Sequence, residues 1–388
     1  MSKCYNCEEE LTKENRSNEH IILNACGGKL SSEDLLCKTC NNNFGSTYDA
    51  MLARQTSILS NLLHINRDRS NPPAIKGKVS STGEDIFIPF DGELRKAKPI
   101  IIDRREGDQV RLTIEARDMK EFKQIAKGLK KKYPGLPLED LIQSAKHYQG
   151  YLNDSVVLGE NIGGDDAFKA VTKAAVNYFI HKGGYRNYIV HLLPYLRNQV
   201  IIDVARLHFI PLSIYKFEEK EVSHIIKLIG NPDEAILYCY IEYFNAQTYI
   251  VWLSKNYDGP AIDETYIYDV IGCRELEKPI MITYNKAELE SIFNENTERP
   301  FSLIKDRYSR VIAIAKKRQD SQHIEMLSQQ VVDEAFKDIP EGDNIQDVEI
   351  FLKKLSGIAA HKFTPFIIHK QKGQQSLQEN HRPDNSSQ

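Results

Sequence analysis

Two Cys-x-x-Cys pairs near the start of the chain constrain its fold more than any other feature. They are Cys4 with Cys7 and Cys37 with Cys40, and 29 residues separate the two pairs. An x-x gap lets two thiolates on one turn reach the same ion, and zinc favours tetrahedral sites with soft ligands. The spacing therefore predicts a structural zinc ion that stabilises a module too small to fold alone. Four unrelated thiols are the alternative.

The composition indicates the cellular compartment in which this protein is expected. The 388 residues include 41% hydrophobic and 27% charged residues, and at this length more than one domain is expected. The sequence has no apolar run long enough to cross a bilayer, and its first residues lack the pattern of a signal peptide. We therefore expect a cytoplasmic protein whose paired cysteines bind metal rather than form disulfides. Three further cysteines are expected to be small buried residues, namely Cys26, Cys239 and Cys273.

The charge pattern gives only a local argument for binding nucleic acid. The net charge is −3, so the whole chain does not attract phosphate. Lysines and arginines are crowded between residues 54 and 132. Each cluster taken alone is explained by a solvated helix or loop face. Together, directly after the cysteine segment, they are suited to a surface that follows a phosphate backbone.

Changes of pattern along the chain predict an α+β protein in consecutive parts. We expect a zinc-stapled module at 1–70, a small α+β domain or linker region at 71–157, a larger α+β domain at 158–369 and a disordered tail at 370–388. Helices are expected at about 46–63, 119–132, 286–295, 301–335 and 345–355, and between the glycine pairs 163–164 and 183–184. Strands are expected at 86–90, 99–102, 110–116, 235–244, 248–253 and 265–270, the last three in a half-buried antiparallel sheet.

The cysteine segment also contains residues that could take part in catalysis or bind a cation. Glu19-His20-Ile21-Ile22 precedes Gly27-Gly28, and Cys40 leads directly into Asn41-Asn42-Asn43-Phe44-Gly45. In order and content the segment resembles the HNH endonuclease family. It is most similar to the subgroup in which two Cys-x-x-Cys knuckles fasten a ββα-metal fold and the second knuckle is followed by Asn. The resemblance covers about the first 50 residues.

The resemblance implies a role for each of these residues. A β-hairpin carries His20 and the next helix carries Asn41, with one divalent cation, magnesium or manganese, between them. His20 is then the general base, a role that suits an imidazole because its pKa lies near neutral pH. Glu19 and Asn41 are then ligands of the cation, which prefers oxygen donors.

Several positions leave alternatives open. The middle Asn of the family name, which braces the histidine loop, has no Asn in register; Asp34 is the nearest candidate and Ser32 is another. His20 is otherwise a buried, hydrogen-bonded histidine or a fifth zinc ligand. Asp49 either supports the cation site from a distance or is an exposed acid in the first turn of a helix.

These observations predict a metal-dependent endonuclease that hydrolyses DNA. The resemblance implies a setting in bacterial restriction or phage defence, and the rest of the chain is expected to bind DNA, sense a signal or mediate self-association. Two alternatives remain open: a zinc-module protein that binds nucleic acid without cleaving it, and a regulatory interaction protein that acts through its C-terminal region. The glycine pairs lack the pattern of a phosphate-binding loop, which disfavours nucleotide hydrolysis.

Overall fold

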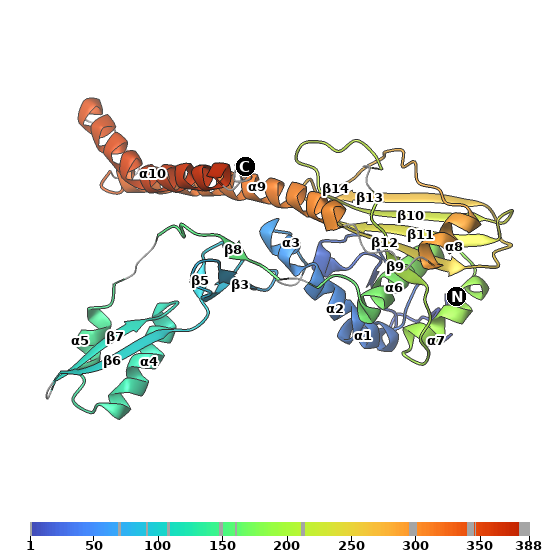
Figure 1. Cartoon of the computed structure of the whole chain (residues 1–388), viewed down its shortest axis with the longest axis horizontal. Coiled ribbons are helices and arrows are strands. Elements are labelled where there is room, and N and C mark those ends of the chain that lie inside the picture. Colours follow the sequence, from blue (N-terminus) through green and yellow to red (C-terminus); the bar gives the residue numbers. More distant parts are fainter. Residues whose placement is uncertain are drawn as a thin grey trace, which may run out of the picture. The chain divides into compact units, whose positions relative to one another are not determined.

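The computed structural model divides the chain into two compact units. It describes residues 2–68, 71–90, 92–106, 109–146, 150–159, 161–210, 214–294, 301–339, 345 and 347–379. The first unit contains residues 1–75 and 160–317, and the second contains 76–159 and 318–388 (Figure 1). Each unit therefore joins two stretches that are distant in the sequence. The grouping differs from the consecutive parts predicted above, because residues 1–75 pack with the chain beyond residue 160.

A six-stranded antiparallel sheet forms the centre of the first unit, with the strand order β14-β13-β10-β11-β12-β9. Its strands are β9 (Ala205–Leu207), β10 (Ser223–Asn231), β11 (Ile236–Tyr243), β12 (Gln247–Ser254), β13 (Ile262–Asp269) and β14 (Arg274–Glu275). Aromatic and β-branched residues predominate in β11 and β12, which suits a pleated surface. The three strands predicted for this region correspond to β11, β12 and β13. The sequence did not predict β10, whose apolar run is interrupted by His224 and Lys227.

This sheet is covered on both faces, whereas the sequence predicted a half-buried sheet. Every residue of β11 and β12 is buried. One face packs against α6 (Asp165–His181), and the other carries a second apolar cluster that includes Leu289 and Phe293 of α8 (Lys286–Asn294). The helices that cover the sheet are distant in the sequence from β11 and β12. The residue pattern within those strands therefore does not predict that both faces of the sheet are covered.

The N-terminal segment has the ββα order that the resemblance implied. Its elements are β1 (Glu19–His20), η1 (Asn24–Cys26), β2 (Ser31–Ser32), α1 (Lys38–Ser46), α2 (Tyr48–Gln55) and α3 (Ser57–Leu62). β1 and β2 pair antiparallel, with Glu19 opposite Ser32 and His20 opposite Ser31. The helix predicted from residue 46 is in fact a series of three short helices, and the first begins already at Lys38.

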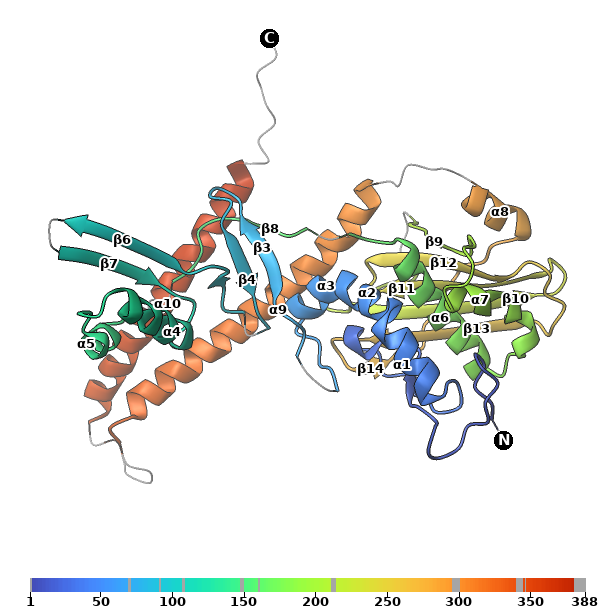
Figure 2. The same cartoon turned by 90° about the horizontal axis from the view of Figure 1, so that it is seen from below.

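The N-terminal segment is built into the first unit. Figure 2 shows α6 between the N-terminal helices and the sheet, and α6 contacts both α2 and β12. Gln55 exchanges two hydrogen bonds with the backbone of Gly163, which precedes α6. The glycine has φ of +83°, a conformation that a residue with a Cβ adopts only with strain. His224 of β10 bonds the carbonyl oxygen of Cys26 at 2.8 Å.

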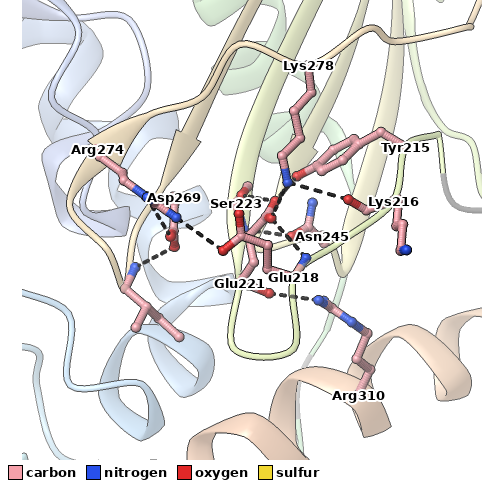
Figure 3. Close-up of polar contacts among 11 residues, drawn as sticks. Tyr215, Lys216, Glu218, Glu221, Ser223, Asn245, Asp269, Arg274, Lys278 and Arg310 are labelled. Carbon is pink, nitrogen blue, oxygen red and sulfur yellow. Dashed lines mark hydrogen bonds and ion pairs between the residues drawn. The ribbon is translucent and has the colours of Figure 1, made fainter.

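A buried polar network around Glu221 fixes α9 (Phe301–Phe336) to the sheet (Figure 3). The Glu221 carboxylate accepts hydrogen bonds from Lys278 at 2.6 Å and from Ser223 at 3.0 Å. Arg310 of α9 donates to the Glu221 carbonyl oxygen at 2.7 Å. Burial tends to raise the pKa of Glu221, but the bonds from Lys278 and its neighbours outweigh it and hold the pKa below its ordinary value. Glu221 is therefore charged at neutral pH.

The second unit contains two small sheets and several helices. Strands β3 (Ile75–Val79), β4 (Asp85–Ile88), β5 (Arg95–Lys96) and β8 (Val156–Val157) form a sheet in the order β5-β4-β3-β8, and β6 (Ile100–Glu106) pairs with β7 (Gln109–Glu115). The helices are α4 (Met119–Lys132), α5 (Leu138–Gln143), the later part of α9, and α10 (Val348–Glu379). The predicted helix at 119–132 matches α4.

The C-terminal region is more helical than predicted. α10 continues to Glu379, so the first part of the tail predicted at 370–388 is helical, and residues 380–388 lie outside the described part. No helix in the described ranges is both long and apolar enough to span a membrane.

Candidate metal centre and active site

The paired cysteines form one cluster. The Sγ atoms of Cys4, Cys7, Cys37 and Cys40 all lie within 4.8 Å of one another. Cys7 and Cys37, one from each pair, have their sulfurs 3.8 Å apart. Zn–S bonds of about 2.3 Å at tetrahedral angles place neighbouring sulfurs about 3.8 Å apart, so the cluster fits a zinc ion. Of the other cysteines, Cys26 and Cys239 are buried as predicted, whereas the prediction for Cys273 is wrong because this residue is exposed.

A cavity of about 560 Å³ is lined by site residues that the sequence predicted. Glu19, His20 and Asn41 all line it. Asp49, whose support of the site was left open above, also lines it, together with three ionisable residues that the sequence did not place there, namely Arg67, Asp68 and Lys173. Glu19 and His20 come from strand β1 of the hairpin, and Asn41 comes from the first turn of α1. Lys173 comes from α6.

Glu19 is held firmly within the protein. It is 2% exposed, and its partners are both on α6. Lys173 Nζ lies 2.6 Å from Glu19 Oε1, and Asn177 Nδ2 donates to the same oxygen at 2.9 Å. A buried carboxylate is tolerated when it is paired and hydrogen-bonded in this way. Glu19 is therefore fixed as a negatively charged group at the cavity wall.

His20 is a partly exposed imidazole next to an acid. Its Nε2 atom lies 3.4 Å from Asp68 Oδ2, and 24% of its side chain is exposed. Burial lowers the pKa of His20, and the negative charges of Asp68 and Glu19 oppose that shift. The imidazole is therefore neutral at neutral pH, as a general base requires. Within the described residues, the metal-binding cluster contains the four cysteines and not His20, which gives no support to a fifth zinc ligand.

Asp68 is itself held in place by two neighbours. Lys29 Nζ lies 2.6 Å from Asp68 Oδ1, and Asn24 Nδ2 donates to Asp68 Oδ2 at 2.6 Å. The backbone N–H of Asp68 also donates to the Asn24 side chain at 3.0 Å. Asp68 follows α3 and was not singled out in the sequence. It meets His20 only because the chain returns to the hairpin.

Asn41 and the two candidates for the middle position differ in location. Asn41 Nδ2 donates to Ser17 Oγ at 3.0 Å, which leaves Oδ1 of the amide to accept or to bind a cation. Asp34 is exposed, accepts a hydrogen bond from Ser2 Oγ at 2.8 Å, and is not among the described residues that line the cavity. Ser32 lies opposite Glu19 in the hairpin. The bracing role of Asp34 remains a prediction.

Asp49 is a buried residue that lines the cavity. The interpretation as an exposed acid is wrong, since Asp49 is 7% exposed. Its Oδ2 lies 2.5 Å from Lys173 Nζ, whereas its Oδ1 is buried and has no hydrogen-bond partner among the described residues. Burial raises the pKa of Asp49 to about 6, against the opposing charge of Lys173. A buried carboxylate oxygen without a partner, on a residue that lines a cavity, is suited to a cation.

The sequence of α6 contains a pattern of polar residues that indicates buried polar contacts. Lys169, Lys173 and Asn177 follow one another at intervals of four in a helix that is otherwise mostly apolar. Residues four apart lie on one face of a helix, so this line of polar groups requires buried partners. The sequence predicted this helix but not the buried partners of its polar side chains. Arg67 belongs to the basic stretch 54–132 that the sequence linked to a phosphate backbone, whereas for Asp68 we find no comparable signal.

Comparison with known proteins identifies the N-terminal segment. Residues 4–57 match the sequence model of a family described as HNH endonuclease, which confirms the predicted resemblance for this segment. The match supports a nuclease activity, and the nucleases of this family depend on metal. No curated protein and no solved structure matches the chain. Asp68, Arg67 and the whole of α6 lie outside the matched residues.

Proposed function

We propose that the protein is a DNA endonuclease that hydrolyses phosphodiester bonds with the help of one magnesium or manganese ion. The observation that carries the proposal is that Glu19, His20 and Asn41 line a single cavity in the segment that matches the HNH family. The cysteine cluster, with a structural zinc ion, joins the start of that segment to the start of α1. DNA as the substrate follows from the resemblance, as does the setting in restriction or phage defence.

The residues at the cavity fit a hard divalent cation. Glu19 supplies a carboxylate and Asn41 an amide oxygen, and Asp49, whose buried Oδ1 has no hydrogen-bond partner in the described structure, lines the same cavity. Carboxylate and carbonyl oxygens are the ligands that magnesium and manganese prefer. When bound, such an ion polarises the phosphate and stabilises the charge on the leaving oxygen.

The side chains around the cation site divide the remaining tasks. His20, neutral and partly exposed, accepts the proton of the attacking water. Asp68 orients the imidazole through its contact with Nε2. Arg67 lines the same cavity, and its Nε is buried without a hydrogen-bond partner in the described structure. A guanidinium in this situation is suited to a phosphate oxygen of the substrate.

DNA cleavage by the purified full-length protein tests the proposal. Plasmid and linear DNA are incubated with and without magnesium or manganese, using the wild-type protein and the His20→Ala variant. Loss of a general base lowers the rate by about 10²- to 10⁴-fold. We expect nicking by the wild-type protein only with the metal, and a loss of that order in His20→Ala.

A histidine on the protein surface supplies the matched control. His181 lies at the end of α6 and is exposed. His181→Ala is expected to cleave like the wild-type protein. Zinc content and thermal unfolding are measured for all three proteins. Metal-dependent cleavage that persists in His20→Ala contradicts the assignment of the base, and a wild-type protein that binds DNA without cutting it supports the non-catalytic alternative.

A further inference from the structure

Two residues of α6 hold the same oxygen of Glu19. Lys173 Nζ lies 2.6 Å from Glu19 Oε1, and Asn177 Nδ2 donates to that oxygen at 2.9 Å. Lys173 is 1% exposed and Asn177 is fully buried. Both residues lie more than 100 positions beyond the segment that matches the HNH family. Neither belongs to the ββα module.

We propose that Lys173 and Asn177 are positioning residues that orient Glu19 for cation binding, so that α6 is part of the active site. The inference rests on the proposed function, because the group they orient is the proposed cation ligand. Both donors bind Oε1, and in the described structure no hydrogen bond restrains Oε2. The second oxygen is therefore left to the cavity that Glu19 lines.

Lys173 also holds a second carboxylate next to Glu19. Its Nζ atom lies 2.5 Å from Asp49 Oδ2, so one ammonium bridges the two buried acids. Two carboxylates this close repel each other strongly in a buried site unless a cation lies between them. The ammonium offsets that repulsion and fixes one oxygen of each acid. The remaining oxygens, Oε2 of Glu19 and the unpartnered Oδ1 of Asp49, both belong to side chains that line the cavity.

Asn177 is in turn oriented by the first cysteine knuckle. Tyr5, which lies between Cys4 and Cys7, donates its hydroxyl proton to Asn177 Oδ1 at 2.8 Å. This bond fixes the amide so that its NH₂ group faces Glu19. Arg186, beyond the end of α6, donates to the Tyr5 carbonyl oxygen at 2.6 Å. A continuous chain of hydrogen bonds thus joins the knuckle, α6 and the cation ligand.

Binding of Mn²⁺ to the full-length protein, measured by electron paramagnetic resonance, tests this inference without relying on cleavage. The variants are Lys173→Met, Asn177→Ala and Tyr5→Phe. The matched control is Lys169→Met, one turn earlier on α6, where the lysine pairs with Asp165 rather than with Glu19. Loss of a residue that orients a metal ligand typically weakens metal binding about 10- to 100-fold.

We expect a loss of that size in Mn²⁺ affinity for Lys173→Met and Asn177→Ala, and a smaller loss for Tyr5→Phe. Lys169→Met is expected to bind Mn²⁺ like the wild-type protein. A merely structural role predicts lower thermal stability with unchanged Mn²⁺ affinity, and that result overturns the inference. If Lys173→Met does not fold, Asn177→Ala and Tyr5→Phe decide, since neither removes a buried charge: Asn177→Ala loses the bonds to Glu19 and from Tyr5, and Tyr5→Phe loses only the latter.

The two proposals fail in different ways. A wild-type protein that binds Mn²⁺ but leaves DNA uncut contradicts the proposed function, while the variants still decide the positioning role. A wild-type protein that cleaves DNA, with Asn177→Ala and Lys173→Met that retain full Mn²⁺ affinity, contradicts the positioning role alone. A wild-type protein that binds no Mn²⁺ overturns both.

Discussion

Burial decides the chemical state of single residues in this protein. His224 is fully buried at the junction between β10 and the N-terminal segment. The backbone N–H of Phe244 donates to His224 Nδ1 at 3.2 Å, so Nε2 carries the proton and donates to the Cys26 carbonyl oxygen. Burial lowers the pKa of His224 to about 4, although the bond to Cys26 opposes the shift. The neutral imidazole is thus a fixed link in the fold.

This histidine makes the stability of the protein sensitive to acid. Unfolded His224 takes up a proton below its ordinary pKa of about 6.5, whereas the folded residue does so only near 4. The unfolded state therefore binds more protons between these values, and stability falls as the pH falls. At about pH 5 we expect the contribution of His224 alone to lower the free energy of unfolding by about 2 kcal/mol relative to about pH 7.

Urea unfolding of the wild-type protein and of His224→Gln at the two pH values measures this contribution. The glutamine retains an N–H donor for Cys26 but does not titrate. We expect the loss of stability in acid to be smaller in His224→Gln by about 2 kcal/mol. An equal acid-induced loss in the two proteins contradicts the assignment.

At the scale of elements, the two cysteine knuckles hold a short hairpin that has little regular structure of its own. β1 and β2 contain two residues each. A sheet of that size is not stable in water without further support. The two knuckles supply this support. The backbone N–H of Tyr5, in the first knuckle, donates to the carbonyl oxygen of Leu35, which lies next to the second knuckle, at 3.1 Å. We therefore expect zinc binding to be coupled to the position of Glu19 and His20.

Loss of a single knuckle cysteine tests this coupling. In zinc-finger peptides zinc supplies about 10–16 kcal/mol of apparent binding energy, more than the stability of a typical domain. We expect Cys37→Ser to lose the zinc ion, the fold of the N-terminal segment and the cleavage activity. Cys239→Ser, which changes a buried thiol of β11 outside the cluster, is the matched control and is expected to retain zinc.

Zinc content by metal analysis and amide hydrogen exchange check both variants. Faster exchange in Cys37→Ser is expected for residues near the knuckles, such as Tyr5 and Ile21. A Cys37→Ser protein that retains one zinc ion per chain, or that loses zinc but keeps slow exchange at these amides, contradicts the coupling.

At the scale of the whole molecule, the first unit is one structure that the chain assembles from two distant stretches. Residues 1–75 contribute the hairpin, the knuckles and three short helices, and residues 160–317 contribute α6 and the sheet. Buried residues of both stretches, among them Ile22, Leu52, Val171 and Leu228, belong to one hydrophobic cluster. The N-terminal segment therefore completes its core, and the lining of the cavity, with residues from the later stretch.

A fragment of residues 1–75 loaded with zinc is accordingly expected to lack the native fold and the activity. Without α6 and the sheet it exposes the apolar side chains that they cover, and Glu19 loses both Lys173 and Asn177. Circular dichroism, thermal unfolding and cleavage of plasmid DNA compare it with the full-length protein. A cooperatively unfolding fragment that cuts DNA with magnesium contradicts this prediction and favours an independent module.

The sequence predicted features that depend on local spacing. The knuckle cysteines, Glu19, His20 and Asn41 all lie within the first 41 residues; the spacing of the cysteines indicated a zinc site, and the resemblance to the HNH family implied a cation site next to it. The helix at 119–132 was also predictable because its polar and apolar residues alternate at the helical period, and Asp118 caps its start by accepting from the Glu121 N–H. In each case the determining residues are neighbours along the chain.

The chain sequence by itself determined which ligands are available and that four thiolates can share one ion, since short spacings leave the backbone few alternatives. Only the tertiary structure decided that Lys173 and Asn177 hold Glu19, that Asp68 meets His20 and that Asp49 is buried. The contact between Asn177 and Glu19 spans 158 positions, and that between Lys173 and Asp49 spans 124. Contacts of this kind follow from the packing of α6 between the sheet and the N-terminal segment. Hydrophobic packing is non-directional and joins residues that are distant in the sequence, so no short stretch of sequence predicts it.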